Sequence, residues 1–230
     1  MTKLSVIVTA GGSSSRYGKT NKLLEKIDEK EVIIRSIQAF LPHTAIKSIM
    51  STEIIVSASE SLEPQIKELL KKYDIKNVKV VRGGATRQAS VFNALKACDN
   101  PDYVAIHDAA RPLIKHEDIQ KCLELAMSKK AAIVAVKAVD TIKVVKQDGE
   151  IINTPDRDTL WAVQTPQIFD YEMIMDVHKK LEGQSFSDDA GMAEASGIKV
   201  FVSEGSYSNI KITTKKDIFL ARMLFEDDAQ

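Results

Sequence analysis

A loop rich in glycine and serine, followed by two cations, is the segment of this chain best suited to chemistry. Residues 4–9 are apolar and β-branched, and they run directly into Ala-Gly-Gly-Ser-Ser-Ser at residues 10–15, with Arg16 and Lys22 close behind. Glycine permits close backbone approach, and loop N–H groups and cations together bind phosphate oxygens. The segment predicts a buried strand that ends in a polyphosphate-binding loop, although a solvated basic loop would share this composition.

The glycine spacing argues against two common nucleotide motifs. A dinucleotide-binding fingerprint needs Gly-x-Gly-x-x-Gly, and a P-loop closes with Gly-Lys-Ser or Gly-Lys-Thr. Here Gly11 and Gly12 are followed by three serines, so neither spacing is met. A nicotinamide-dependent oxidoreductase is therefore disfavoured.

A second pair of glycines, Gly83 and Gly84, stands between a strand-like segment and a helix-like one. Paired glycines at a helix N-terminus suit a closely approaching ligand such as a base or ribose. Ser90 is well placed to contact such a ligand. A tight strand-to-helix turn is the alternative interpretation of these residues.

Asp108 ends another hydrophobic segment, within His-Asp-Ala-Ala-Arg-Pro at residues 107–112. Mg²⁺ prefers one or two carboxylates together with phosphate oxygens, so Asp108 is a candidate metal ligand. Arg111 can pair with a carboxylate or a phosphate. No serine or cysteine partner is suggested for His107, and we expect a structural role for it rather than general-base catalysis.

The second half of the chain carries further candidates. Residues 156–167 hold the only tryptophan and a polar Gln-Thr-Pro-Gln turn, and Arg157 is a candidate for binding a second anion. Lys211 lies among strand-like residues and either faces outward or reaches into the site. Ser187 and the two aspartates after it favour a helix N-cap followed by acids that the helix dipole stabilises, with a metal site as the alternative.

The elements that must position these residues alternate over the first 136 residues. Short apolar segments rich in Val and Ile predict strands at residues 4–9, 53–57, 78–81, 103–107 and 131–136. Helices are predicted between them at residues 32–41, 62–73, 87–97 and 117–129. This order predicts an α/β fold with a mainly parallel sheet and helices on both faces. Ligands of such folds bind beyond the carboxyl ends of the strands, where the loops above lie.

The pattern changes near residue 137. Residues 139–145 and 150–154 predict a hairpin whose turn contains Asp148-Gly149. An isolated two-stranded arm is marginal in water, so we expect an arm at about residues 138–158 that packs on something such as a second subunit. A decorative surface hairpin is the alternative. The rest predicts a helix at 171–181, strands near 199–202 and 210–212, and a closing helix from 215 to about 224, which makes residues 1–230 one domain with an arm.

Composition narrows the class of protein. The 230 residues include 32 basic and 32 acidic ones, and this zero net charge disfavours a general nucleic-acid-binding protein. The sequence has no apolar run of about 18 residues, so no membrane span is predicted. The N-terminal residues lack a signal-peptide pattern. Cys98 and Cys122 form no metal-like pair and are expected as reduced thiols in or near the core. These features predict a cytoplasmic enzyme.

Taken together, the segments resemble the 2-C-methyl-D-erythritol 4-phosphate cytidylyltransferases of the non-mevalonate isoprenoid pathway. The resemblance covers nearly the whole chain and is most specific in residues 107–112 and in Asp-Arg-x-x-Leu-Trp-x-x-Gln-Thr-Pro-Gln at 156–167. Ribitol-5-phosphate cytidylyltransferases are similar, but they tend to carry Ser-Val in place of Ala109-Ala110 and to lack the Leu-Trp pair. The resemblance implies a Rossmann-like, glycosyltransferase-A-like nucleotidyltransferase fold and transfer of a cytidylyl group from CTP to methylerythritol phosphate, with release of pyrophosphate.

The resemblance also implies roles for individual residues. The matched catalytic cations are Arg16, Lys22 and Lys211. The positions matched around the nucleotide are Ala10, Gly11, Gly12, Ser13, Gly83, Ser90 and Asp108, the last of which lies near Mg²⁺. The positions matched to the methylerythritol phosphate site are Arg111, Thr141, Arg157 and Thr165. In the family the arm exchanges between two subunits, which implies a homodimer with Thr141 and Arg157 acting in the partner's active site.

One departure from the family pattern falls in the first loop. The family usually carries a further glycine between Gly12 and the arginine, where this chain has Ser13-Ser14-Ser15. The serine hydroxyls either add donors to the triphosphate or tighten the loop and weaken CTP binding. A ribitol-5-phosphate cytidylyltransferase and a non-catalytic nucleotide-binding protein are the alternative functions.

Overall fold

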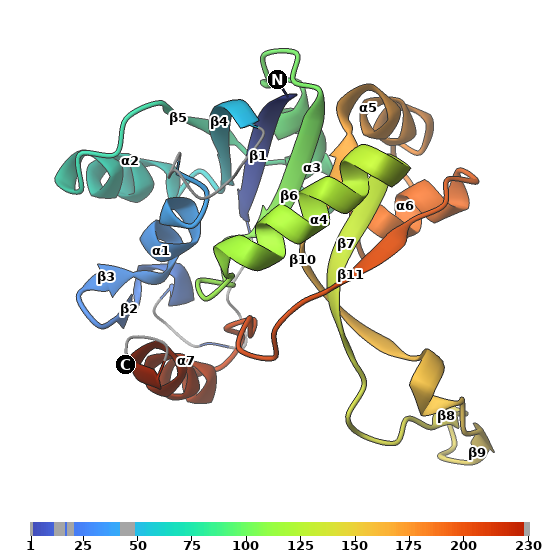
Figure 1. Cartoon of the computed structure of the whole chain (residues 1–230). Coiled ribbons are helices and arrows are strands. Elements are labelled where there is room, and N and C mark those ends of the chain that lie inside the picture. The colour runs from blue at the N-terminus through green and yellow to red at the C-terminus, as the bar shows by residue number, and fades with distance from the viewer. Residues whose placement is uncertain (1, 12–16, 18–20, 42–48, 228–230) are drawn as a thin grey trace.

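A seven-stranded sheet with the order β11-β7-β10-β6-β1-β4-β5 forms the centre of the protein in a computed structural model (Figure 1). The structure describes residues 2–11, 17, 21–41 and 49–227. The strands of the sheet are β1 (Thr2–Ala10), β4 (Ile49–Ala58), β5 (Val78–Arg82), β6 (Tyr103–Asp108), β7 (Ala131–Lys137), β10 (Trp161–Asp170) and β11 (Phe201–Glu204). Neighbouring strands are parallel except where β10 pairs with β6 and β7.

The strand β1 lies in the middle because its side chains are apolar on both faces. Val6 pairs with Ile54 of β4 on one side and with Ala105 of β6 on the other. Residues 4–8 are at most 1% exposed, as expected for a strand that helices cover on both faces. The five strands predicted in the first 136 residues are confirmed, each somewhat longer than predicted.

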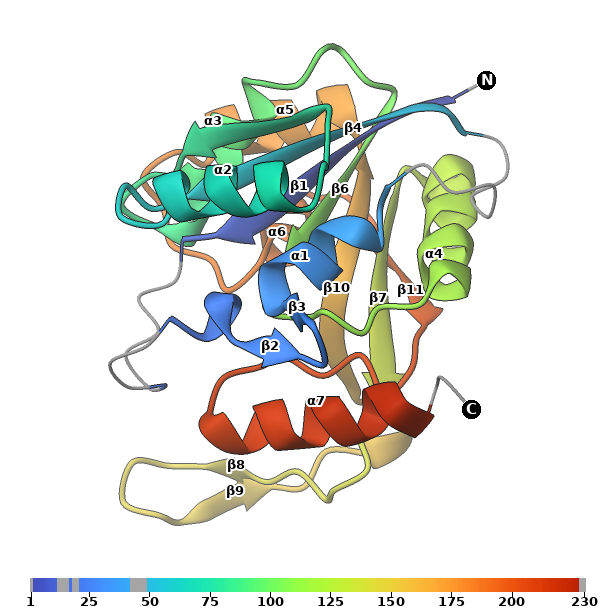
Figure 2. The same cartoon turned by 90° about the vertical axis from the view of Figure 1, so that its left-hand side faces the viewer.

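Helices cover the two faces of the sheet (Figure 2). One apolar core contains side chains from α1 (Val32–Gln38), α2 (Glu63–Lys72), α4 (His116–Lys129) and α7 (Lys215–Asp227). The other core contains side chains from α3 (Arg87–Leu95), α5 (Tyr171–Lys180) and α6 (Asp189–Ala195). The predicted helices are confirmed to within three residues at each end.

The strand β10 corrects the interpretation of residues 164–167. The Gln-Thr-Pro-Gln sequence was expected to form a polar turn, but it lies inside this ten-residue strand. The pairing register with β7 shifts between Val163 and Gln167, around Pro166, which has no N–H to donate. The polar side chains here are buried and hydrogen-bonded to distant segments, and so the strand tolerates them.

Smaller expectations also prove wrong. Residues 210–212 form no strand, because Ile212 N–H donates instead to Ala110 O in the loop after β6, at 2.8 Å. Asp188 rather than Ser187 is the N-cap of α6, since its carboxylate accepts the Gly191 N–H at 2.9 Å and the helix dipole favours that charge.

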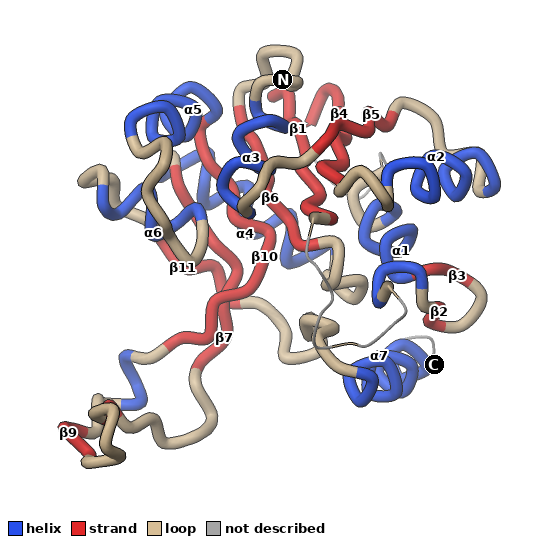
Figure 3. Tube along the Cα trace, turned by 180° about the vertical axis from the view of Figure 1, so that it is seen from behind, coloured by secondary structure: helices blue, strands red, loops and turns tan. Residues whose placement is uncertain are grey.

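The arm leaves the sheet between β7 and β10 and projects from the molecule (Figure 3). Its paired strands, β8 (Val144–Val145) and β9 (Ile151–Asn153), are shorter than the predicted hairpin strands. Most large apolar side chains of the hairpin are exposed: Val139, Ile142, Val144, Val145, Ile151 and Ile152. The remaining short strands, β2 (Lys26–Ile27) and β3 (Lys30–Glu31), form a separate pair.

Cys98 and Cys122 are free thiols, half-buried and buried respectively. Burial raises the pKa of both thiols, to about 12 for Cys98. Among the helices that the structure describes, none has the length and apolar character needed to span a bilayer.

Candidate active site

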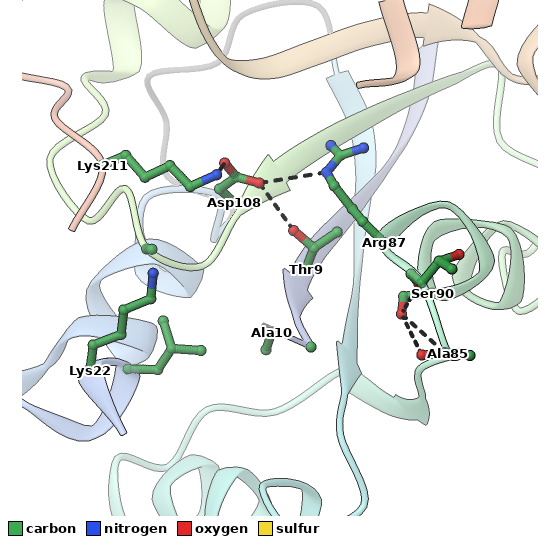
Figure 4. Close-up of a pocket in the computed structure, with 13 residues that line it drawn as sticks. Thr9, Ala10, Lys22, Ala85, Arg87, Ser90, Asp108 and Lys211 are labelled. Atoms are coloured by element: carbon green, nitrogen blue, oxygen red, sulfur yellow. Dashed lines mark hydrogen bonds and ion pairs between the residues drawn. The ribbon is translucent and has the colours of Figure 1, made fainter. Parts of the chain in front are cut away.

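The loops that follow β1, β5 and β6 meet at the carboxyl end of the sheet and line one pocket of about 210 Å³ (Figure 4). This is the edge at which the sequence predicts ligand binding. Six of the predicted site residues line the pocket: Ala10, Gly11, Lys22, Ser90, Asp108 and Lys211. Gly12, Ser13 and Arg16 lie outside the described residues.

Asp108, at the end of β6, lies among three cations. Its Oδ2 is 2.7 Å from Lys211 Nζ and 3.9 Å from Arg111 Nε. Its Oδ1 is 3.3 Å from Thr9 Oγ1 and 4.0 Å from Arg87 Nε. Burial opposes ionisation, but the charges of Lys211, Arg87 and Arg111 hold the pKa of this carboxyl well below its usual range. Asp108 is therefore an ionised carboxylate whose charge is shared among several neighbours.

Lys211 reaches this carboxylate because its segment lies along the loop after β6. The Arg111 guanidinium donates to Asn209 O at 2.7 Å, and Ile212 N–H donates to Ala110 O at 2.8 Å. These two bonds hold residues 209–212 beside Asp108. The structure therefore supports a Lys211 side chain that reaches into the site, rather than one that faces outward.

Lys22 comes to the same pocket from the N-terminal part of the chain. It starts the short 3₁₀ helix η1 (Lys22–Leu24), whose N-terminus is capped by the Asn21 side chain. Its Nζ donates to Ile212 O at 2.7 Å. Lys22 thus contacts the same short segment near the C-terminus that carries Lys211.

The turn between β5 and α3 forms another wall of the pocket. Ser90 Oγ accepts the Gly84 N–H at 3.0 Å and donates to Thr86 O at 2.8 Å. A Cβ atom on Gly83 would lie 2.9 Å from Ser90 Oγ, and one on Gly84 would lie 2.4 Å from Ala89 Cβ. The glycines are therefore required by the tight turn itself, which was the alternative interpretation, while Gly84 and Ser90 still face the pocket.

His107 is buried and structural, as expected. Its Nε2 is 3.0 Å from Arg111 O, a carbonyl that can only accept, so Nε2 carries the proton. The Nδ1 atom of the neutral ring then accepts the Thr165 hydroxyl at 3.1 Å, and the same hydroxyl accepts the Asp108 N–H at 3.0 Å. Burial lowers the pKa of His107 to about 4, which keeps the ring neutral.

Comparison with known proteins identifies the family. Residues 4–227 match the family model of 2-C-methyl-D-erythritol 4-phosphate cytidylyltransferase. The chain belongs to this family. The cytidylyltransferase of that name from Caldanaerobacter subterraneus is 42% identical over 225 residues, with 96% of this chain and 97% of the relative covered. The one from Clostridioides difficile is 40% identical, with 96% and 92% covered.

Solved structures bear out the expected fold of this cytidylyltransferase. The crystal structure of 4-diphosphocytidyl-2C-methyl-D-erythritol synthase from Anaerococcus prevotii has a TM-score of 0.84 and 33% identity to this chain. The structural match covers 98% of this chain and 96% of the Anaerococcus protein. The sheet and its helices are therefore a Rossmann-like nucleotidyltransferase fold.

The residues matched to the second substrate of the cytidylyltransferase family fall into two groups. Arg111 and Thr165 lie against Asp108, where their side chains bind backbone groups. Thr141 and Arg157 are exposed on the arm, and neither lines the pocket of its own chain. Arg157 Nη1 donates to Val139 O within the arm at 3.3 Å.

The donors around Asp108 fit a metal ion that arrives with phosphate ligands. Within the described part of the chain, no group of three or more His, Cys, Asp or Glu side chains could hold a metal. Mg²⁺ is commonly bound by one or two carboxylates together with substrate phosphates. The single ionised carboxylate of Asp108 suits that arrangement, but it does not suit a metal held by the protein alone.

Arg87 lines the pocket and Asp189 lies behind it, although the sequence analysis assigned neither a role there. Arg87 Nη1 donates to Asp189 Oδ2 at 2.7 Å, across 102 positions in the sequence. Arg87 lies in the first turn of α3, where the helix dipole disfavours a cation. This unfavourable position of a cation indicates that Arg87 needs a carboxylate partner, but the sequence does not identify that partner.

Proposed function

We propose that this protein transfers the cytidylyl group of CTP to 2-C-methyl-D-erythritol 4-phosphate. One observation carries the proposal: Lys22, Asp108 and Lys211 meet in one pocket of a chain that matches this family over residues 4–227. An oxygen of the sugar 4-phosphate attacks the α-phosphorus of CTP. The bond between the α-phosphorus and the bridging oxygen breaks, and pyrophosphate leaves with the electron pair.

This reaction needs no general base, because an ionised phosphate is already a nucleophile. His107 has both ring nitrogens engaged and is fully buried, which agrees with a mechanism without proton abstraction. The rate enhancement then depends on positioning and on electrostatic stabilisation of the phosphates. We assign the stabilising charges to Lys22 and Lys211, together with Arg16.

Mg²⁺ is the cofactor that we propose for this site. Asp108 would hold it, because it is an ionised carboxylate at the strand end where the phosphates would lie. When bound, the ion would neutralise charge on the triphosphate. Ala10, Gly11, Gly12, Ser13, Gly83 and Ser90 would surround the nucleotide.

We further propose a homodimer formed through the arm. The exposed apolar side chains of residues 139–152 support it, since an arm of this kind needs a surface to cover it. Thr141 and Arg157 would then bind methylerythritol phosphate in the partner's site, opposite Arg111 and Thr165. A cytoplasmic location is consistent with the two free thiols.

Pyrophosphate release tests the proposal directly. The protein is mixed with CTP, Mg²⁺ and either 2-C-methyl-D-erythritol 4-phosphate or ribitol 5-phosphate. We expect release with the first sugar phosphate alone. Release only with ribitol 5-phosphate would keep the mechanism but change the substrate, and no release from folded protein that binds CTP would favour a non-catalytic nucleotide-binding protein.

A further inference from the structure

Asp189 is a fully buried carboxylate that the reaction above does not use. His178 Nε2 lies 3.1 Å from its Oδ1, and Arg87 Nη1 donates to its Oδ2 at 2.7 Å. Burial alone would raise the pKa of Asp189, but the Arg87 charge and the His178 hydrogen bond lower it below its usual value. Burying an ionised carboxylate costs free energy unless such partners surround it. The position of Asp189 beside Arg87 therefore needs an explanation.

Arg87 stands between two carboxylates and is bonded to only one of them. Its Nη1 makes a short bond to Asp189, whereas its Nε lies 4.0 Å from Asp108 Oδ1, beyond hydrogen-bond distance. Figure 4 shows the side chain reaching from α3 towards Asp108 across the pocket. A movement of the guanidinium that closes this gap would bring an N–H onto Asp108, and the bond to Asp189 opposes such a movement.

The position of Arg87 determines whether one of the two oxygens of Asp108 stays open to a metal ion. Oδ2 is occupied by the Lys211 ammonium at 2.7 Å, but among the described residues Oδ1 has a long contact to the Thr9 hydroxyl, at 3.3 Å, and the more distant Arg87. An arginine N–H bonded to Oδ1 would occupy that oxygen and bring a positive charge closer to it. A divalent cation would then compete with two protein cations for a single carboxylate.

We propose that Asp189 is a positioning residue that keeps Arg87 from hydrogen-bonding to Asp108, so that Asp108 remains able to bind the divalent cation of a nucleotide complex. His178 supports this role by holding the other oxygen of Asp189. The inference rests on the proposed function, since it concerns the cation that accompanies CTP.

The test measures metal binding without turnover. Mn²⁺ replaces Mg²⁺ in the presence of CTP and without a second substrate, and free Mn²⁺ is read by electron paramagnetic resonance well below each melting temperature. We expect Asp189→Asn to weaken Mn²⁺ binding roughly tenfold or more, the usual effect of losing a residue that orients a metal ligand. The double variant Arg87→Gln/Asp189→Asn should bind Mn²⁺ more tightly than Asp189→Asn, because the competing cation is gone.

Double-variant binding that is as weak as that of Asp189→Asn, or weaker, would overturn the inference alone. It would mean that Arg87 itself holds the nucleotide or that Asp189 only stabilises the fold. A wild-type protein that does not bind Mn²⁺ with CTP would overturn the proposed function, and this inference with it. If Asp189→Asn does not fold, Arg87→Gln is compared with the double variant, and a difference in affinity above about twofold would overturn the inference.

Asp188→Asn is the matched control. Asp188 caps α6 through the Gly191 N–H and accepts a bond from Gln167, but makes no hydrogen bond to Arg87. We expect this variant to lower the melting temperature and to weaken Mn²⁺ binding much less than Asp189→Asn does, because the Asp188 charge acts on Arg87 without a hydrogen bond. An equal loss of affinity in Asp188→Asn and Asp189→Asn would show a general effect of disturbing α6 and would overturn the inference.

Discussion

Lys211 brings a positive charge from the C-terminal part of the chain into the pocket beside the end of β6. Its ammonium contacts Asp108, yet the side chain is 44% exposed, so it is free to meet a ligand in the pocket. We expect Lys211→Gln to lower kcat for pyrophosphate release by about 10²–10³, the effect of losing one stabilising donor of developing charge. The melting temperature should change little.

Steady-state kinetics at saturating CTP and sugar phosphate provide the measurement. Lys215→Gln is the control, because Lys215 is an exposed lysine at the start of α7 that does not line the pocket. A kcat of Lys211→Gln close to wild type would remove Lys211 from the catalytic residues.

His107 links stability to pH. Its pKa is lowered from 6.5 to about 4 in the folded state, so the unfolded chain binds the proton more tightly. The free energy of unfolding should therefore fall as the pH drops from about 6.5 to about 4, by on the order of 3 kcal/mol from this group. The lowered pKa of Asp108 acts in the same direction but at lower pH, below the usual range of an aspartate.

Urea unfolding of His107→Gln at a series of pH values tests this assignment. We expect the variant to be less stable at neutral pH, because a buried ring is replaced, but to lose less stability over the window from about 6.5 to about 4. The same pH dependence in the variant and the wild type would assign the effect to another group.

At the scale of elements, the turn from β5 into α3 depends on Gly84. A Cβ atom there would lie 2.4 Å from Ala89 Cβ and 2.9 Å from the Ala89 carbonyl carbon, so the start of α3 would have to move. We expect Gly84→Ala to lower the free energy of unfolding by about 1–3 kcal/mol, as overpacking does. CTP binding should weaken as well, because this turn lines the pocket.

Chemical denaturation and CTP titration measure both effects. Gly11→Ala is the control for stability, since a Cβ atom at Gly11 would meet Ser90 Oγ at an ordinary 3.4 Å. Equal stabilities of the two alanine variants would show that the turn relaxes without cost.

The strand β10 and the segment after it form a second functional element. Asn209 Nδ2 donates to Gln164 Oε1 at 2.9 Å and to Thr165 O at 3.0 Å, and Gln164 Nε2 donates to Ser206 O. These bonds from a buried strand hold the loop that carries Lys211. The polar residues of β10 therefore hold Lys211 in place rather than forming a turn.

At the scale of the whole molecule, the arm decides whether one chain makes a complete site. Mixed Arg157→Ala and Lys22→Ala proteins should regain up to about a quarter of wild-type activity, because half of randomly mixed dimers would hold one intact site. Pyrophosphate release after demonstrated subunit exchange is the measurement.

Mixing Lys22→Ala with Lys211→Ala provides the matched control. Both lysines line the pocket of their own chain, so no mixed dimer of these two variants contains an intact site. Rescue in this control, or no rescue in the first mixture, would contradict a site shared between subunits.

The order of strands and helices, and the edge of the sheet at which ligands are expected to bind, follow from local sequence patterns. The apolar runs at residues 4–9, 53–57 and 103–107 encode buried strands through local composition, and the helices between them encode the parallel order. The carboxyl ends of parallel strands share one edge, so the loops that carry Gly11, Gly84 and Asp108 are expected at the ligand-binding edge of the sheet. In the structure these three residues line one pocket at that edge.

The partners of the polar side chains, in contrast, emerge from the folded chain alone. The contact of Lys22 with the Ile212 carbonyl, the bond between Arg87 and Asp189, and the position of Gln164 inside a strand each depend on residues far away in the sequence. Local propensity describes a residue and its neighbours, whereas a buried polar group must be paired with whatever the folded chain brings beside it. For this reason the elements followed from the sequence, but the charge network around Asp108 did not.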